Sequence, residues 1–201
     1  SIFFVETLIN GLLLGGVLAL LSLGLNLIFG VIDVVWICYA EIIMLGMYTI
    51  YFLHVDGGMP LIAAVACGVG VTACLGWLTH RLVIGYLLQA APINQLLATG
   101  GLLFFFQGAA MVAFGVEFRS LGVSLGSLAL SEDIYLSWTR LLSFTIAAGV
   151  VVVLYQFLAR SYLGAAIRAI SQDREIMILM GVDTKKLYLL TSAIGGGLAG
   201  L

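Results

Sequence analysis

The chain has 201 residues, of which 63% are hydrophobic and only 9% are charged, and its mean hydropathy is +1.21. So few charged side chains cannot cover the surface of a soluble domain of this size, which excludes a soluble globular protein. The composition indicates an all-α fold, a polytopic transmembrane helical bundle in contact with membrane lipid. The net charge of −2 implies no nucleic acid as partner, and the three cysteines show no metal-binding spacing, so neither a metal nor a cofactor is expected.

The first expected helix lies between two acidic residues. No charged residue interrupts the sequence from Glu6 to Asp33, and this run is long enough for one membrane-spanning helix at about 7–29. Within it, Gly11 and Gly15 have the spacing that lets a second helix approach closely.

Two carboxylates flank the start of the second expected helix, at about 36–54. Asp33 is expected to be interfacial or to act as an N-cap favoured by the helix dipole. Glu41 has two interpretations: it faces protein or a water-filled cavity at membrane depth, or it is an acid in the first helical turn, close to water. The sequence leaves both open.

A polar turn separates the second helix from the third. The turn ends in Pro60, which suits the first turn of a helix at about 60–79. His80 and Arg81 follow this helix. His80 is therefore expected to be a solvated helix terminus.

The next uncharged run is too long for one span. Pro92 breaks it, so residues 82–95 are expected to form an interfacial or re-entrant bend and 96–115 a fourth helix. Gln107 lies in the middle of that helix, where it hydrogen-bonds a neighbouring helix or touches the transported solute.

Two more helices complete the expected bundle of about six. A Gly- and Ser-rich loop at 116–137 precedes a fifth helix at 138–159, and a sixth begins at Leu187. Gly196 and Gly200 give the sixth helix a second close-packing site. Its apolar run is too short to cross a bilayer, so we expect a single transmembrane domain over 1–201 that continues in a longer parent protein.

The polar loop at 160–186 sets the expected orientation. It holds five of the eight basic residues of the chain, and short loops rich in Lys and Arg stay on the cytoplasmic side. Alternation of the helices then places 116–137 and the N-terminus outside, and the basic residue Arg81 inside.

A helix is expected inside this loop, over Ala165–Met180, with Gly181 as its C-terminal cap. Its residues divide into an apolar and a charged face. Such a helix docks into a groove on a soluble partner or lies on the lipid surface, and composition alone does not decide between them.

The loop carries a resemblance to a known family. The run from Gly164 to Glu175, followed by Gly181, resembles the cytoplasmic coupling loop of ABC-importer permeases of the branched-chain amino acid type, whose pattern is Glu-Ala-Ala-three residues-Gly. Glu175 and Gly181 match the pattern, while Ile176 and Met177 stand in place of the alanines. Further similar runs cover nearly the whole chain.

One segment departs from the family. Where the family usually reads Asn-Phe-Ala-His-Gly-Glu, this chain has Trp36-Ile-Cys-Tyr39-Ala40-Glu41. The identity of the solute depends on this segment if it shapes the translocation path. Branched-chain or hydrophobic amino acids, amides and urea are the solutes that the resemblance allows.

The resemblance implies a transport subunit of the bacterial inner membrane that is not itself an enzyme, since the chain has no phosphate-binding loop. The implied partners are ABC ATPase subunits, a second permease, like or unlike, and an extracytoplasmic solute-binding protein. The residues expected to couple to the ATPase are Arg168, Asp173, Arg174, Glu175 and Gly181. Glu41 and Gln107 are candidates for the translocation path.

Two other functions fit the composition. A gradient-driven secondary transporter or channel would use an intramembrane carboxylate, for which Glu41 is the deepest candidate. No inverted repeat supports it. An inert membrane-scaffold subunit is the third interpretation, and it follows from the altered segment 36–40.

Overall fold

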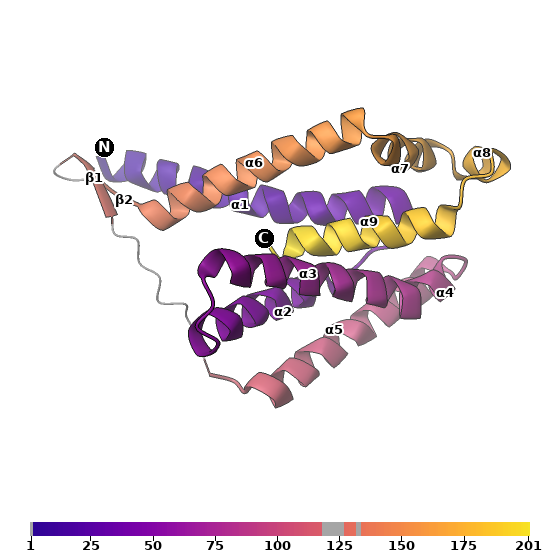
Figure 1. The fold of residues 1–201 in the computed structure, drawn as a ribbon, viewed down its shortest axis with the longest axis horizontal. Coiled ribbons are helices and arrows are strands. Elements are labelled where there is room, and N and C mark those ends of the chain that lie inside the picture. Colours follow the sequence, from indigo (N-terminus) through magenta and orange to yellow (C-terminus); the bar gives the residue numbers. More distant parts are fainter. Residues whose placement is uncertain (1, 118–126, 132–133) are drawn as a thin grey trace.

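The computed structural model describes residues 2–117, 127–131 and 134–201 and is almost entirely helical, which confirms the all-α bundle (Figure 1). Its first half consists of α1 (Ile2–Ile32), α2 (Tyr39–Tyr51), the π-helical turn η1 (Phe52–Asp56), α3 (Leu61–Thr79), the π-helical turn η2 (His80–Ile84), α4 (Gly85–Leu87) and α5 (Pro92–Phe114). Its second half consists of β1 (Ser127–Ser131), β2 (Ile134–Ser137), α6 (Trp138–Arg160), α7 (Tyr162–Gln172), α8 (Arg174–Leu179) and α9 (Thr184–Ala199).

Four helices of the described chain are long and apolar enough to cross a membrane. They are Glu6–Ile32, Leu61–Leu87, Pro92–Phe114 and Trp138–Arg160. The other two expected spans are present but shorter: α2 continues through η1 to Asp56, and α9 has 16 residues. The bend expected at 82–95 is confined to 88–91, because η2 and α4 extend the third helix to Leu87.

The loop ends sort to two ends of the molecule. The N-terminus and the antiparallel pair β1–β2 lie at one end, and α4, α7 and α8 lie at the other (Figure 1). This is the grouping that the expected alternation requires. The β1–β2 pair lies within the loop expected outside, and the sequence analysis did not predict it.

Glycines bring α3 and α9 into close contact. A Cβ atom built at Gly76 would lie 2.5 Å from the Ser192 carbonyl oxygen, and one at Gly196 would lie 2.6 Å from the Thr72 carbonyl oxygen. Only hydrogen at these positions lets the backbones approach so far. The small-residue spacing of the sixth helix therefore functions in packing, as the sequence indicated.

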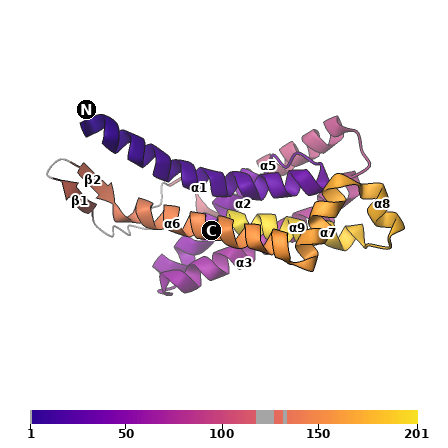
Figure 2. The ribbon, with the colours of Figure 1, turned by 90° about the horizontal axis from the view of Figure 1, so that it is seen from above.

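The corresponding spacing in α1 has a different outcome. A Cβ atom at Gly11 or Gly15 would have nothing within 4 Å among the described residues. The N-terminal end of α1 turns away from the bundle (Figure 2), but α1 still contacts α6 beside these glycines: a Cβ atom at Gly16 would clash with an α6 side chain, and Arg140 donates a hydrogen bond to the Asn10 amide oxygen at 3.0 Å. The close packing expected at Gly11 and Gly15 is not made within the described chain.

The expectation of a solvated terminus at His80 is wrong. His80 is only 3% exposed, and its Nδ1 atom is hydrogen-bonded to the Ser192 hydroxyl at 3.0 Å. The helix continues beyond it through η2, and its ring lies 6.3 Å from that of Tyr188 on α9. A polar partner on α9, seen only in the fold, makes burial of the imidazole acceptable.

The main apolar cluster joins segments that are far apart in the sequence. It contains Ile28 and Ile32 of α1, Trp36 of the following loop, Ile167 and Ile170 of α7, and Tyr188 of α9. The expected cytoplasmic loop is therefore anchored in the same core as the membrane helices.

Substituting Gly76 with Ala should destabilise the protein by about 1–3 kcal/mol, because the new methyl group overpacks the α3–α9 contact. Gly70→Ala on the same helix is the control, since a Cβ there meets nothing within 4 Å. Thermal unfolding of both purified variants in detergent tests this. Equal melting temperatures for the two variants would contradict the close contact.

Candidate functional site

The polar loop is built from two short helices instead of one. The helix expected over Ala165–Met180 ends at Gln172 and restarts at Arg174, because Asp173 is extended, with φ −150° and ψ 105°. The Asp173 carboxylate accepts hydrogen bonds from the backbone N–H groups of Glu175 and Ile176, both at 3.0 Å. Asp173 is thus the N-cap of α8, a role that favours a break over continuation.

Gly181 ends α8 as expected. Its φ of +78° is the left-handed conformation that glycine adopts without strain. The Gly181 N–H donates to the Ile178 carbonyl at 3.0 Å, and the Val182 N–H donates to the Met177 carbonyl at 3.2 Å. These two bonds form a Schellman motif.

Two basic residues of the loop, Arg168 and Arg174, contact the neighbouring helices. The Arg174 guanidinium lies over the Tyr188 ring of α9, 5.0 Å from its centroid. The Arg168 guanidinium donates to the Leu158 carbonyl oxygen at the end of α6. Glu175 is exposed in the first turn of α8. Of the five expected coupling residues, two therefore contact α6 or α9, and two set the ends of α8.

The apolar residues of the loop divide between core and surface. Ile167 and Ile170 of α7 are buried in the main cluster, and Met177 of α8 packs against it. Leu179 and Met180 at the end of α8 are 85% and 74% exposed. We call these two residues, with the half-exposed Ile176 and Ile178, the apolar tip of α8.

Asp183 marks where the loop returns to the bundle. Its carboxylate accepts from the backbone N–H of Lys186 at 3.2 Å and forms an ion pair with the Lys186 ammonium at 3.1 Å. These bonds hold the pKa of Asp183 in the folded protein below its usual value. The cap therefore adds to the free energy of unfolding at any pH above the pKa of Asp183 in the unfolded chain, and this stabilisation is lost as the pH falls through the lower pKa of the folded protein.

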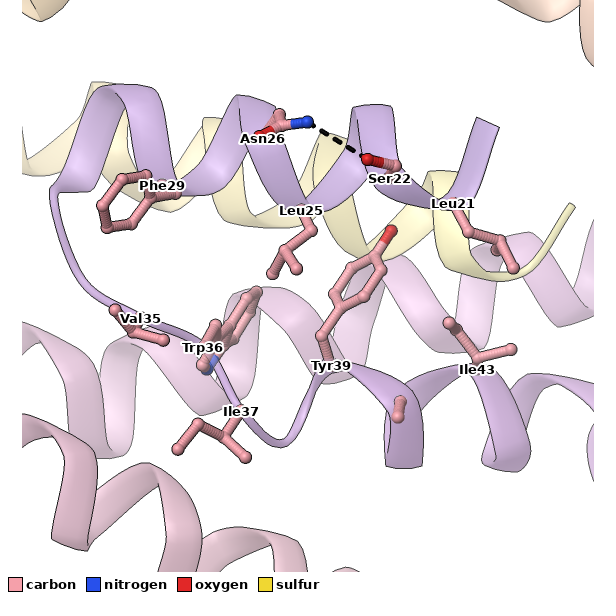
Figure 3. A pocket seen from close by; sticks show the side chains of 11 residues that line it. Leu21, Ser22, Leu25, Asn26, Phe29, Val35, Trp36, Ile37, Tyr39 and Ile43 are labelled. Atoms are coloured by element: carbon pink, nitrogen blue, oxygen red, sulfur yellow. Dashed lines mark hydrogen bonds between the residues drawn. The ribbon is translucent and has the colours of Figure 1, made fainter. Parts of the chain in front are cut away.

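A pocket of about 550 Å³ lies between α1 and the start of α2 (Figure 3). We call it the α1–α2 groove. Two polar side chains, Ser22 and Asn26, belong to its α1 wall, and the Asn26 amide donates to the Ser22 hydroxyl at 3.2 Å. The rest of its lining is apolar or aromatic: Leu21, Leu25, Phe29, Val35, Trp36, Ile37, Tyr39, Ala40 and Ile43.

The segment that departs from the family pattern forms one wall of this groove. Trp36, Tyr39 and Ala40 all line it. The Tyr39 hydroxyl crosses to α9 and donates to the Gly195 carbonyl at 3.0 Å. Trp36 is 1% exposed, and its indole N–H has no hydrogen-bond partner among the described residues. A buried donor without a partner costs roughly 1–3 kcal/mol of folding free energy. The observed arrangement of this wall therefore leaves one hydrogen-bond donor unsatisfied.

The two candidates for the translocation path lie on different helices. Glu41 is half-buried in the first turn of α2, next to groove-lining Ala40, and Gln107 is exposed on α5. Neither residue lines the groove.

Asp33 is not an N-cap: it follows the last residue of α1 with a φ of +58°, and Cys38 precedes α2.

Ser22, Asn26 and Tyr188 were not singled out from the sequence. The signal available for the first two was a pair of polar residues four apart within an apolar helix, which places them on one face. For Tyr188 no local signal exists, because its partners Arg174 and His80 are on other elements.

A family model and curated relatives match the chain over nearly its whole length, and all are described as permeases of branched-chain amino acid transport systems. A family model described as branched-chain amino acid transport system, permease component, matches residues 7–201. The high-affinity branched-chain amino acid transport system permease protein BraD of Pseudomonas aeruginosa is 28% identical over 209 residues, covering 98% of this chain and 68% of BraD. LivH of Escherichia coli K12, described in the same words, is 24% identical over 211 residues with the same coverage. No solved structure matches the chain.

Substituting Asp173 with Ala should speed amide hydrogen exchange in α8, because the helix loses a cap worth roughly 0.5–2 kcal/mol. Asp173→Asn keeps an acceptor oxygen and is the control. Mass-spectrometric exchange on residues 174–180 of both variants measures the effect. Wild-type exchange in the Ala variant would show that the cap does not hold α8.

Proposed function

The chain belongs to the family of branched-chain amino acid transport system permease components, and we propose how its cytoplasmic loop couples it to ATP. It is the membrane-spanning permease subunit of an ABC importer and a multi-pass protein of the bacterial inner membrane. Its solute is a branched-chain amino acid, as the names of BraD and LivH state for those relatives. ATP hydrolysis takes place on separate ATPase subunits.

The observation that carries the coupling proposal is the apolar tip of α8. Leu179 and Met180 are largely exposed at the end of α8, a helix that is capped at both ends. A short, rigid helix with an apolar tip and charged neighbours fits a groove on a soluble protein. We assign that groove to the ATPase subunit, and we assign the loop 160–186 to coupling.

Two routes connect this dock to the membrane helices. In the first, Ile167 and Ile170 pack in the cluster that contains Trp36. In the second, Arg174 contacts Tyr188, which lies beside His80 at the end of α3. Movement of the loop by the ATPase would therefore move α1, α3 and α9 through packed contacts.

The five coupling residues have distinct roles in this proposal. Asp173 and Gly181 fix where α8 starts and stops. Arg174 and Arg168 tie the loop to α9 and α6. Glu175, exposed on α8, is left to contact the ATPase.

The remaining partners complete the importer. A second permease subunit, like or unlike, would form the other half of the membrane unit, and an extracytoplasmic binding protein would deliver the solute to the end with the N-terminus. In this scheme Glu41 and Gln107 are assigned to the translocation path. The single permease domain 1–201 contributes the coupling loop and one wall of the path.

Leu179→Glu should weaken co-purification of the ATPase from membranes by more than about tenfold, because a carboxylate replaces an apolar contact. Gln172→Glu is the matched control, since it adds the same carboxylate to the exposed end of α7 and removes no apolar surface. The assay is a pull-down of the full-length permease. An equal yield of ATPase with both variants would exclude the apolar tip as the dock.

Uptake by the complete transporter in proteoliposomes should require ATP and persist when an ionophore collapses the proton gradient. The physical reason is that the energy enters through the coupling loop and not through a protonated carboxylate. Radiolabelled leucine uptake measures it. Uptake that stops with the ionophore and does not depend on ATP would contradict the proposal and would indicate a gradient-driven transporter that uses Glu41.

A further inference from the structure

We propose that the α1–α2 groove is the site where the permease holds its solute and selects it by the size of its aliphatic side chain. This inference rests on the proposed function and names residues that select the solute. The groove has a volume typical of small-molecule sites, and its lining is mostly apolar with a few polar groups, as in such sites.

The polarity of the groove fits an amino acid better than a lipid chain. Ser22 and Asn26 offer a hydroxyl and an amide on the α1 wall (Figure 3). These groups suit the polar end of a zwitterion, whereas an acyl chain would require none of them.

The apolar part of the groove fits an aliphatic side chain. Leu25, Phe29 and Ile37 line it and are each more than a third exposed in the described chain, so they are free to contact a solute. Ala40 is small, and any enlargement at this position would occupy groove volume. Position 40 therefore limits the side chain that can enter.

The groove also has a means of responding to the ATPase. Its Trp36 wall lies in the cluster that receives Ile167 and Ile170 from the coupling loop. The unpaired Trp36 donor makes the observed arrangement of this wall less stable than one in which the donor finds an acceptor. Movement of the loop would thus change the shape of the groove.

The test compares leucine with alanine uptake by the complete transporter in proteoliposomes. Ala40→Leu should lower the kcat/KM ratio of leucine to alanine by about tenfold or more, because filling the groove excludes the larger side chain. Ala19→Leu is the matched control, being the same change at an exposed position of α1 that does not line the groove. It should leave the ratio unchanged.

A transporter with Ala40→Leu that still hydrolyses ATP and keeps the wild-type ratio would overturn the inference. An equal loss for both solutes would also overturn it and would indicate lipid or a packed helix as the occupant. If Ala40→Leu does not assemble, Leu25→Ala provides the test: the enlarged groove should raise phenylalanine uptake relative to leucine, and an unchanged ratio refutes the site.

The outcome is separate from that of the proposed function. A wild-type transporter without ATP-driven uptake would refute the proposed function, whereas an active transporter with unchanged selectivity refutes only this site.

Discussion

The structure depends on the insertion of Ile167 and Ile170 into the main apolar cluster. A polar loop between two membrane helices has no intrinsic reason to hold a fixed position, because water can solvate it in many conformations. Burial of these two side chains against α1 and the segment after it removes that freedom. The α7 part of the loop is thus packed against the membrane helices, and α8 follows it with an exposed apolar tip.

The close contact between α3 and α9 is a second constraint on the structure. The glycines of α3 and α9 bring two backbones into contact. Close-packed contacts of this kind have low compressibility and transmit strain. Tyr188 lies on α9 and His80 directly follows α3, and Arg174 contacts Tyr188 from the loop. In the proposed mechanism, a force on α8 would be transmitted to this pair of helices and to the wall of the groove.

Much of this arrangement could be predicted from the sequence, because long uncharged runs predict membrane helices. The six helices, the glycine cap at Gly181 and the small-residue contact at Gly196 are all readable from local patterns. The break at Asp173 was missed because the apolar residues on both sides continue a helical period, and only the capping bonds reveal it.

Other features depend on partners that no local pattern names. His80 looked solvated because Arg81 follows it, yet Ser192 from α9 makes its burial acceptable. The α1–α2 groove is likewise a product of the fold. Ser22 and Asn26 belong to a groove only because the chain returns after α1 and adds Trp36 and Tyr39 to the same lining. The altered segment 36–40 was recognisable from sequence, but its place on a groove wall was not.

The central claim is that the coupling loop and the groove change together. The most direct measurement is the rate at which a thiol reagent labels Ile37→Cys in the groove, with Cys38, Cys67 and Cys74 replaced by Ala, in the complete transporter without nucleotide and with ATP trapped. The account predicts that the labelling rate differs between the two states and that Leu179→Glu abolishes the difference. A transporter that turns over while Ile37→Cys is labelled at one rate in both states would contradict it.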